Sequence, residues 1–250
     1  MKTIPQFTVI HEDENFIAVN KAPGISVGGD RWDRNEERLD KLVAEKLSVE
    51  KLFTVHRIDR ETSGVVVFAK NEETHRRLSL AFEGREIGKK YIAVVRGRPP
   101  WRETDCDLPL VPDGNKRHET IIDKYRGKKS LTRFILLGNA GNYSILEAAP
   151  KTGRTHQIRV HAAALGYPVA CDGLYGKDTP VFLSDFKKNY KGDRLEEKPL
   201  LERLGLHSLE IVLPAQAVSC PSFALSAPLP KDMAVLIKQM EKVSFSVISF

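Results

Sequence analysis

The sequence predicts an α+β protein, a single domain in which helices flank a mixed, mainly antiparallel sheet. Strand-like and helix-like segments are interspersed without a strict βαβ rhythm, and no unit of roughly 20 to 50 residues repeats. The composition, 41% hydrophobic and 29% charged, is that of an ordinary globular chain. Because 250 residues suffice for one substantial core and no linker divides the chain, we expect one domain over residues 1–250.

The first part of the chain is expected to form a hairpin and two helices. Residues 7–20 contain two strand-like runs around a polar turn. Residues 35–47 place leucine and valine side chains at helical spacing, with two acidic residues in the first turn, where they favour the helix dipole. A second helix is expected from an Asn71 cap to about Phe82, because Asn is a common cap and Gly84 stops the helix.

Further strands are expected where β-branched and aromatic residues gather between turn signals. These segments are residues 64–69, 90–96, 133–137, 143–148, 206–213 and 223–227. Thr155 is expected to cap a helix that runs to Leu165 and ends at Gly166, and a last helix spans about residues 231–242. Residues 177–203 carry seven basic and six acidic residues, so they are predicted to be a polar surface insertion.

Several classes of protein are disfavoured by the sequence. No uninterrupted apolar run is longer than Val65–Ala69, far short of the ~20 residues of a membrane helix, and the first residues do not resemble a secretory signal. The three cysteines, Cys106, Cys171 and Cys220, are widely separated and form no Cys-x-x-Cys pair. We therefore expect a cytoplasmic protein with reduced thiols, no metal, no cofactor and no membrane partner.

Positive charge is concentrated in one region. Between Arg85 and Arg133 there are 13 Lys or Arg against 7 Asp or Glu, an excess equal to the net charge of the whole chain, +6. Such an excess favours a polyanion-binding surface, because each phosphate neutralised by Lys or Arg releases counterions. The alternative is a solvated face that keeps the protein soluble. Composition alone leaves both interpretations open.

The densest polar cluster lies directly before an apolar strand, over residues 56–64 with the sequence HRIDRETSG. Asp59 is the candidate functional residue there, because a carboxyl group beside a buried strand tends to be protonated unless a cation favours its charged form. The alternative is a turn in which Asp59, Thr62 and Ser63 bond local amides. For this cluster alone the turn is the better interpretation.

Two more clusters carry candidate functional residues. Residues 151–161 place five basic-type side chains on a turn and the start of a helix, where helix N-termini attract anions, although an exposed basic face would have the same pattern. His156 and His161 are poorly spaced for a shared metal. The third cluster, residues 89–97, is a strand that contains Tyr91, and a tyrosine in a strand is more often a core residue than a catalytic one.

Together these clusters resemble a known family. HRIDRETSG, KKYIAVVRG and APKTGRTHQIRVHAAALGYPVACDGLYG are similar to the three signature segments of the RluA-type pseudouridine synthases. VNKAPGISV, GKKSLTRF, LHSLEI and APLP also resemble that family, so the resemblance covers nearly the whole chain, with residues 177–203 the least diagnostic. The chain departs from the usual pattern at Ile58, where leucine is common, and in NKAPG, where NKPAG is common.

The resemblance implies roles for particular residues. Asp59 matches the catalytic aspartate, Tyr91 the active-site tyrosine and Arg159 the basic partner of Asp59. Arg57 matches the arginine that fills the space left by the flipped uridine. The other residues expected to bind RNA are Lys151, Arg154 and His156.

The resemblance also implies a reaction, the isomerisation of uridines in ribosomal or transfer RNA without a metal or redox cofactor. We expect no accessory N-terminal RNA-binding domain and no obligatory protein partner. One alternative is a non-catalytic RNA-binding protein on the same fold, but such a protein could dispense with the carboxylate of Asp59. A glycosidase or nuclease would need a second carboxylate or a metal cluster, which the signature segments lack.

Overall fold

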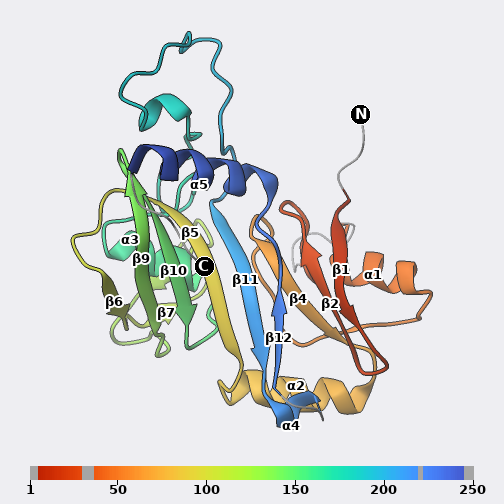
Figure 1. Ribbon diagram of the computed structural model, residues 1–250. Helices are drawn as coiled ribbons and strands as arrows, with labels where there is room; N and C mark the ends of the chain where they lie inside the picture. The colour runs from red at the N-terminus through yellow and green to blue at the C-terminus, as the bar shows by residue number, and fades with distance from the viewer. Residues whose placement is uncertain (1–4, 30–36, 219–221, 245–250) are drawn as a thin grey trace. The chain divides into compact units, whose positions relative to one another are not determined.

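The computed structural model describes residues 5–29, 37–218 and 222–244 and divides the chain into two compact units (Figure 1). The first unit consists of Met1–Lys90 and His207–Pro228, and the second of Tyr91–Leu206 and Leu229–Phe250. The chain passes between the units within two strands, β5 (Gly88–Arg96) and β11 (Leu206–Leu213). Each unit therefore combines segments that are distant in the sequence.

The first unit is a sheet with helices. Its strand order is β1, β2, β4 and β11, with β12 beside β11 and β3 beside β4. Strands β4 and β11 run parallel, and the other strand pairs of this unit are antiparallel. Its remaining elements are β1 (Phe7–Glu12), β2 (Phe16–Lys21), α1 (Leu39–Leu47), β3 (Phe53–Thr54), β4 (Ser63–Ala69), α2 (Glu72–Glu83), α4 (Ala215–Val218) and β12 (Phe223–Ser226).

Strand β4 and helix α2 form the centre of this unit's core. Every residue of β4 is buried, as the continuous apolar run of its sequence predicts. Helix α2 begins where predicted, because the side chain of Asn71 accepts a hydrogen bond from the backbone N–H of Thr74 at 2.9 Å. Leu78 and Ala81 of α2 belong to the same buried cluster as Val67 of β4. Burial of this apolar face stabilises both elements.

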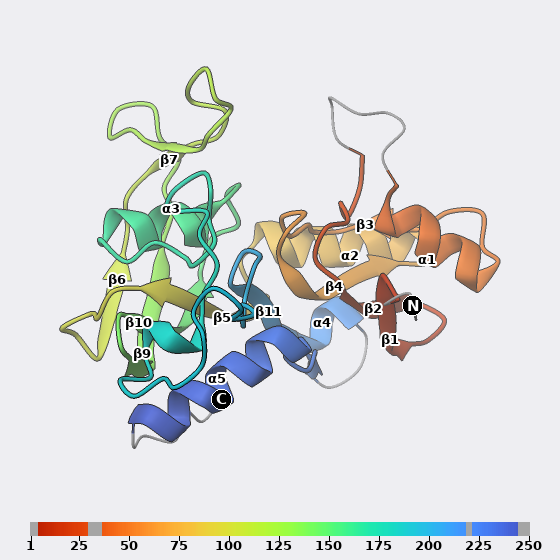
Figure 2. The same ribbon diagram turned by 90° about the horizontal axis from the view of Figure 1, so that it is seen from above.

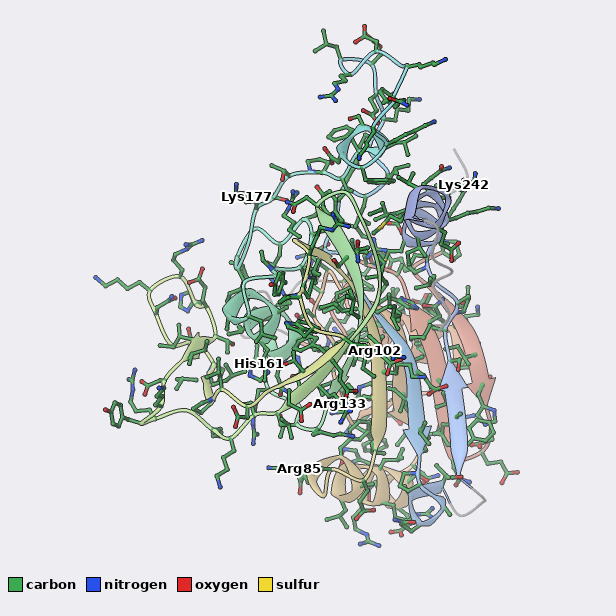
Figure 3. The ribbon with its side chains drawn as sticks, turned by 60° about the vertical axis from the view of Figure 1, so that its left-hand side comes forward. Arg85, Arg102, Arg133, His161, Lys177 and Lys242 are labelled. Atoms are coloured by element: carbon green, nitrogen blue, oxygen red, sulfur yellow. The ribbon has the colours of Figure 1, made fainter. Side chains whose placement is uncertain are left out.

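The second unit is built on an antiparallel sheet in the order β5, β10, β9, β6. Helices α3 and α5 both pack against β9 (Figure 2). Strands β7 and β8 form a separate two-stranded sheet. Arg133 of β9, labelled in Figure 3, forms an exposed ion pair with Glu103 of β6 at 2.6 Å. The further elements are β6 (Glu103–Cys106), β7 (Leu110–Val111), β8 (Ile121–Ile122), β9 (Thr132–Ala140), β10 (Tyr143–Pro150), α3 (Gln157–Ala164), η1 (Leu183–Asp185) and α5 (Lys231–Ser244).

The predicted fold class is confirmed. Within the units the sheets are mixed and mainly antiparallel, and helices accompany them. The long predicted strands and the last helix are present, whereas the short strands β3, β6, β7 and β8 were not predicted. A strand of two to four residues carries too little alternation to be recognised, so its existence depends on the partner strand.

Two predicted helix starts are wrong. Helix α1 begins at Leu39 instead of residue 35, with Arg38 as its cap, and residues 30–36 lie outside the described part of the chain. Helix α3 begins at Gln157, and its cap is His156 in a left-handed conformation (φ 52°) instead of Thr155. The end of α3 agrees with the prediction, since Gly166 has a φ of 89°. Capping propensity alone did not identify these starts because tertiary contacts fix the local backbone.

Residues 177–203 have an exposed tip and buried ends. Val181 and Leu201 are almost completely buried, and Val181 forms an isolated β-bridge with Leu201. Phe186 is also buried. Most of residues 187–198 are exposed, in agreement with their balanced charge. Apolar anchors at the ends thus hold this segment on the second unit.

None of the helices in the described ranges is long and apolar enough to cross a bilayer. Cys106 and Cys171 are buried free thiols, and Cys220 lies outside those ranges. Within the same ranges, no group of three or more His, Cys, Asp or Glu side chains has an arrangement that could hold a metal ion.

Candidate functional site

The loop that carries Asp59 precedes β4 and is held by a buried lysine. Lys21, at the end of β2, is fully buried. Its ammonium group donates to the backbone carbonyl oxygens of Ala22 at 2.9 Å, Ile25 at 2.8 Å and Arg60 at 2.7 Å. A buried charge needs such partners, because water no longer solvates it. Lys21 therefore ties the Asp59 loop to the turn that follows β2.

The same turn makes a second connection to the loop. The backbone N–H of Gly24 donates to the carbonyl oxygen of Arg60 at 2.9 Å, and Arg60 Nε donates to the carbonyl oxygen of Gly24 at 3.0 Å. Within the loop, Ile58 is buried, Asp59 is half-buried and Arg57 is exposed. The buried Ile58 anchors the loop, and its neighbours are left at the surface of this unit, where Asp59 and Arg57 can meet a ligand.

The turn predicted for Asp59, Thr62 and Ser63 is present only in part. The backbone N–H of Thr62 donates to the carbonyl oxygen of Asp59 at 3.1 Å. Ser63, by contrast, bonds a distant residue, since its hydroxyl lies 2.9 Å from Nδ1 of buried His207 on β11. Gly64 follows with a φ of 114°, and a Cβ there would lie 2.1 Å from the carbonyl oxygen of Ser208. The polar end of the cluster therefore joins β4 to β11.

His56 fixes the beginning of the loop as a neutral ring. Its Nε2 accepts a hydrogen bond from the backbone N–H of Val67 at 2.9 Å, and its ring stacks on Phe82 at 4.7 Å between centroids. Burial lowers the pKa of His56 to about 3, and the charge of Lys89 lowers it further in the same direction. The imidazole is therefore uncharged at neutral pH and acts as a hydrogen-bond acceptor.

The shifted pKa of His56 predicts a loss of stability in acid. The unfolded state binds a proton below about pH 6.5, whereas the folded state resists protonation down to about pH 3. Unfolding free energy should therefore fall as the pH drops through this window, by roughly 1 kcal/mol per pH unit. Urea unfolding at several pH values measures the slope. His56→Gln should flatten the slope, because it removes the buried imidazole. Equal slopes in wild type and His56→Gln would contradict this role of His56.

In the second unit, Arg159 of α3 forms a buried ion pair with Asp172. Arg159 Nε lies 2.8 Å from Asp172 Oδ2 and Nη2 lies 2.8 Å from Oδ1, a bidentate geometry. The side chains are 9% and 0% exposed. Burial alone would raise the pKa of Asp172, but the hydrogen bonds and positive charge of Arg159 lower it. Asp172 therefore stays ionised and fixes the plane of the guanidinium group.

Tyr175 connects Arg159 to His156. The ring of Tyr175 lies 5.1 Å from the guanidinium carbon of Arg159. Its hydroxyl oxygen accepts a hydrogen bond from the backbone N–H of Thr120 at 2.8 Å and lies 2.8 Å from His156 Nδ1. Asp172 also accepts from the backbone N–H of Tyr175 at 3.2 Å. The structure thus brings His156 and Arg159 into one network, which Asp172 and Tyr175 complete.

The inner face of α3 is polar and buried, which the sequence pattern did not predict. Gln157 Oε1 accepts from the hydroxyl of Thr152 at 2.6 Å, and Gln157 Nε2 donates to the hydroxyl of Thr132 at 2.9 Å. His161, labelled in Figure 3, lies 3.0 Å from the same hydroxyl through Nδ1, and burial lowers its pKa. These bonds fix the direction of α3, and so the position of Arg159, relative to β9.

The other predicted site residues occupy different environments. Tyr91, 8% exposed, lies on β5 opposite Ala148 of β10. Lys151 is exposed, and Arg154 is half-buried with Nη2 3.5 Å from the carbonyl oxygen of Lys129. Asp59 and Arg57 belong to the first unit, whereas Tyr91, Arg159 and the remaining candidates belong to the second.

Sequence reasoning missed three residues that position these candidates: Lys21, Asp172 and Tyr175. All three lie within the segments that carry the family resemblance, NKAPG and ACDGLYG. A lysine at the end of an apolar strand and an aspartate beside a buried helix are each unusual enough to have been recognised. Their partners, however, are not evident from the local sequence.

Comparison with known proteins identifies the class first. The fold is that of a pseudouridylate synthase: the human RNA pseudouridylate synthase domain containing 4 superimposes with a TM-score of 0.71 over 93% of this chain and 92% of its own, at 22% identity. Residues 15–164 match the family model described as RNA pseudouridylate synthase. The chain therefore belongs to the RNA pseudouridylate synthase family.

Sequence relatives narrow the family further. A dual-specificity RNA pseudouridine synthase RluA from Vibrio cholerae is 35% identical over 182 residues, which cover 72% of this chain and 73% of the relative. A ribosomal large subunit pseudouridine synthase D from Borreliella burgdorferi is 38% identical over 177 residues, 68% of this chain but only 54% of the relative. The chain thus spans about half the length of that relative. The predicted RluA-type family is confirmed.

Proposed function

We propose that this protein converts specific uridines of RNA to pseudouridine and that Asp59 is the catalytic residue. The observation that carries the proposal is the Asp59 loop, in which a half-buried carboxylate follows a buried anchor and lies next to the residue held by Lys21. Family membership supports the reaction, and the loop supports the choice of residue. Because the family model spans parts of both units, we propose that the two units form one catalytic domain.

In the proposed reaction the N1–C1′ bond of uridine breaks, the base turns and C5 joins C1′, with loss of the proton on C5. Asp59 starts it either by attack on the sugar or by removal of a sugar proton, which leads to a glycal. Arg159 keeps Asp59 ionised, and Tyr91 stacks on the uracil. Arg57 fills the space left by the flipped base, while Lys151, Arg154 and His156 bind the RNA backbone.

We propose ribosomal or transfer RNA as the substrate class and the cytoplasm as the location. The names of two relatives support the choice of RNA, since one is named for the large ribosomal subunit and the other for dual specificity. We also propose that the protein needs no metal, no cofactor and no obligatory protein partner. Uridine and pseudouridine are isomers, so the reaction consumes no oxidant or reductant, which supports the lack of a redox cofactor.

The direct test uses purified protein and transcripts of large-subunit ribosomal RNA and of transfer RNA labelled with tritium at C5 of uridine. Pseudouridine formation releases one tritium per event to solvent, and a chelator should not reduce the release unless the RNA needs the ion to fold. A non-catalytic RNA-binding protein would bind the same transcripts without release. Release from neither RNA, together with an unchanged pseudouridine map in cells lacking the gene, would reject the proposed activity.

The regional basic excess predicts an effect of charge reversal on RNA binding. Changing Lys116, Arg117, Lys128 and Lys129 to glutamate should weaken binding about tenfold or more near 0.1 M salt and reduce its salt dependence, because fewer counterions are released. A titration over several salt concentrations measures both quantities.

The matched control reverses four lysines of the insertion, Lys187, Lys188, Lys191 and Lys198. It changes the net charge equally, so a smaller loss of affinity is expected there. An equal loss in both variants would show a general charge effect, and an unchanged affinity in the first would identify residues 116–129 as a solvated face.

A further inference from the structure

Residues 109–129 form a projection from the second unit, here called the basic arm. Strands β7 and β8 pair within it, and residues 112–120 and 123–127 form its two loops. At its base Leu110 and Lys128 exchange backbone hydrogen bonds of 3.0 and 2.9 Å. Figure 2 shows the arm extending away from α3, and in Figure 3 its side chains reach outward. The arm is thus a defined structure with much of its surface open to a ligand.

Tyr125 lies in one of these loops with its side chain almost wholly in water, 98% exposed. The other large hydrophobic side chains that are exposed in the described ranges are aliphatic. The loop itself is tightly bonded: Asp123 Oδ1 accepts from the backbone N–H groups of Tyr125 and Arg126 at 2.9 Å each, and the carbonyl oxygen of Asp123 accepts from Gly127 at 2.9 Å. The ring is therefore presented by an ordered turn.

The ionisation of Asp123 keeps this turn intact at neutral pH. The backbone hydrogen bond from Arg126, its side-chain bond and the bond from Tyr125 lower the pKa of Asp123 to about 2. Arg126 Nε lies 2.7 Å from Asp123 Oδ2, which joins the arginine to the same turn. An exposed aromatic on a preorganised turn binds a flat partner with little loss of conformational entropy.

The arm that carries the ring also carries unneutralised positive charge. The three acidic residues of the arm are each engaged with a neighbour in the arm: Asp113 with His118, Glu119 with Arg117 and Asp123 with Arg126. Four exposed lysines of the arm form no ion pair within the described ranges, namely Lys116, Lys124, Lys128 and Lys129. Cations that are not neutralised internally are available for phosphates.

An arm that carries an exposed aromatic ring and exposed lysines fits single-stranded nucleic acid better than a protein surface. Unpaired bases stack on aromatic side chains, and lysines follow the phosphate backbone. A protein partner would favour a larger apolar surface, but the arm's other exposed large hydrophobic side chain is Ile122, at 38%. The chemistry of the arm therefore favours an unpaired nucleotide with its flanking phosphates.

We propose that Tyr125 stacks on an unpaired base of the substrate RNA and that the basic arm contacts RNA through residues other than the catalytic ones. This inference rests on the proposed function, which supplies RNA as the ligand. The arm acts on affinity and on the choice of target, because it selects RNA with an unpaired nucleotide near the modified uridine. It takes no part in bond breaking.

The test compares Tyr125→Ala, Tyr125→Phe and a control, Leu195→Ala, which also truncates an almost fully exposed side chain of the second unit, 93% exposed. The probes are a fluorescently labelled stem–loop RNA and a blunt duplex of the same length, followed by fluorescence anisotropy. Tyr125→Ala should weaken stem–loop binding about tenfold and leave duplex binding unchanged. Tyr125→Phe and Leu195→Ala should retain wild-type affinity, and a thermal melt should show all three folded.

A second readout addresses the contact itself. Ultraviolet irradiation of the wild-type complex should crosslink Tyr125 to RNA, as detected by mass spectrometry of the digested protein. With a modifiable RNA, Tyr125→Ala should raise KM about tenfold and leave kcat unchanged. Wild-type affinity of Tyr125→Ala for the stem–loop would overturn the inference, and so would equal losses for Ala and Phe or equal losses on the duplex.

Failure of this inference is distinguishable from failure of the proposed function. If the wild-type protein forms pseudouridine but Tyr125→Ala binds and turns over normally, the arm is not an RNA contact and the function stands. If stem–loop binding depends on Tyr125 but no RNA is modified, the arm binds RNA as inferred and the proposed catalysis is rejected.

Discussion

Asp59→Asn is expected to abolish pseudouridine formation while RNA binding and folding are retained. Asparagine keeps the size of the side chain but removes its negative charge and its nucleophilic oxygen pair. Because Asp59 is half-buried and its carbonyl oxygen, which accepts from Thr62, is unchanged, the loop should keep its shape. Phosphate contacts supply most of the affinity, so binding should stay near that of the wild type. Turnover should fall by at least about a thousandfold.

Single-turnover measurement on RNA, a binding titration and a thermal melt test this prediction. Glu61→Gln is a matched control, because it makes the same chemical change at an exposed carboxylate two positions away and should leave turnover intact. Substantial pseudouridine formation by folded Asp59→Asn would reject Asp59 as the catalytic residue. Loss of folding and binding together would instead identify Asp59 as a turn residue.

Arg159→Ala is expected to destabilise the protein and also to stop turnover. The structure supplies the reason for the first effect, because Asp172 is 0% exposed and would become an unpaired buried carboxylate. Removing one partner of a buried pair costs about 3–5 kcal/mol, which corresponds to a fall in Tm of roughly 10 °C for a chain of this size. The second effect follows from the proposed role of Arg159 in keeping Asp59 ionised.

Two further variants separate these effects. Arg203→Ala breaks another bidentate pair of the second unit, with Asp232, but Asp232 is 35% exposed and remains solvated, so a smaller loss of stability is expected. Arg159→Ala combined with Asp172→Ala removes both charges and should recover part of the lost stability without recovering turnover. Wild-type turnover in a folded Arg159→Ala protein would contradict its proposed role, and an unchanged Tm would contradict the importance of the pair.

Asp172 adds a physical constraint to the role proposed for Arg159. Two hydrogen bonds to Asp172, from Nε and Nη2, hold the guanidinium group of Arg159 in one plane. The Tyr175 ring lies beside the same group, and the Gln157 bonds hold the helix that carries it. An arginine side chain that is already held in one orientation loses little conformational entropy when it binds a carboxylate.

The sequence by itself determined the fold class, the family and the candidate residues. Helix α2 was predictable in both its ends because Asn71 and Gly84 act on adjacent backbone groups. Strand β4 was predictable because its run of apolar residues is continuous. Asp59, Tyr91 and Arg159 were selected by their place in three conspicuous segments, and their catalytic roles stay predictions.

The tertiary structure alone decided how the candidates are held, because the contacts that hold them join segments far apart in the chain. Lys21 meets Arg60 across 39 positions, and Ser63 meets His207 across 144. The residue that caps α3 also has a distant partner. His156 has a left-handed backbone conformation, and its ring bonds Tyr175. Local propensity describes only neighbouring backbone groups, whereas burial forces each polar side chain to find a partner wherever the fold supplies one.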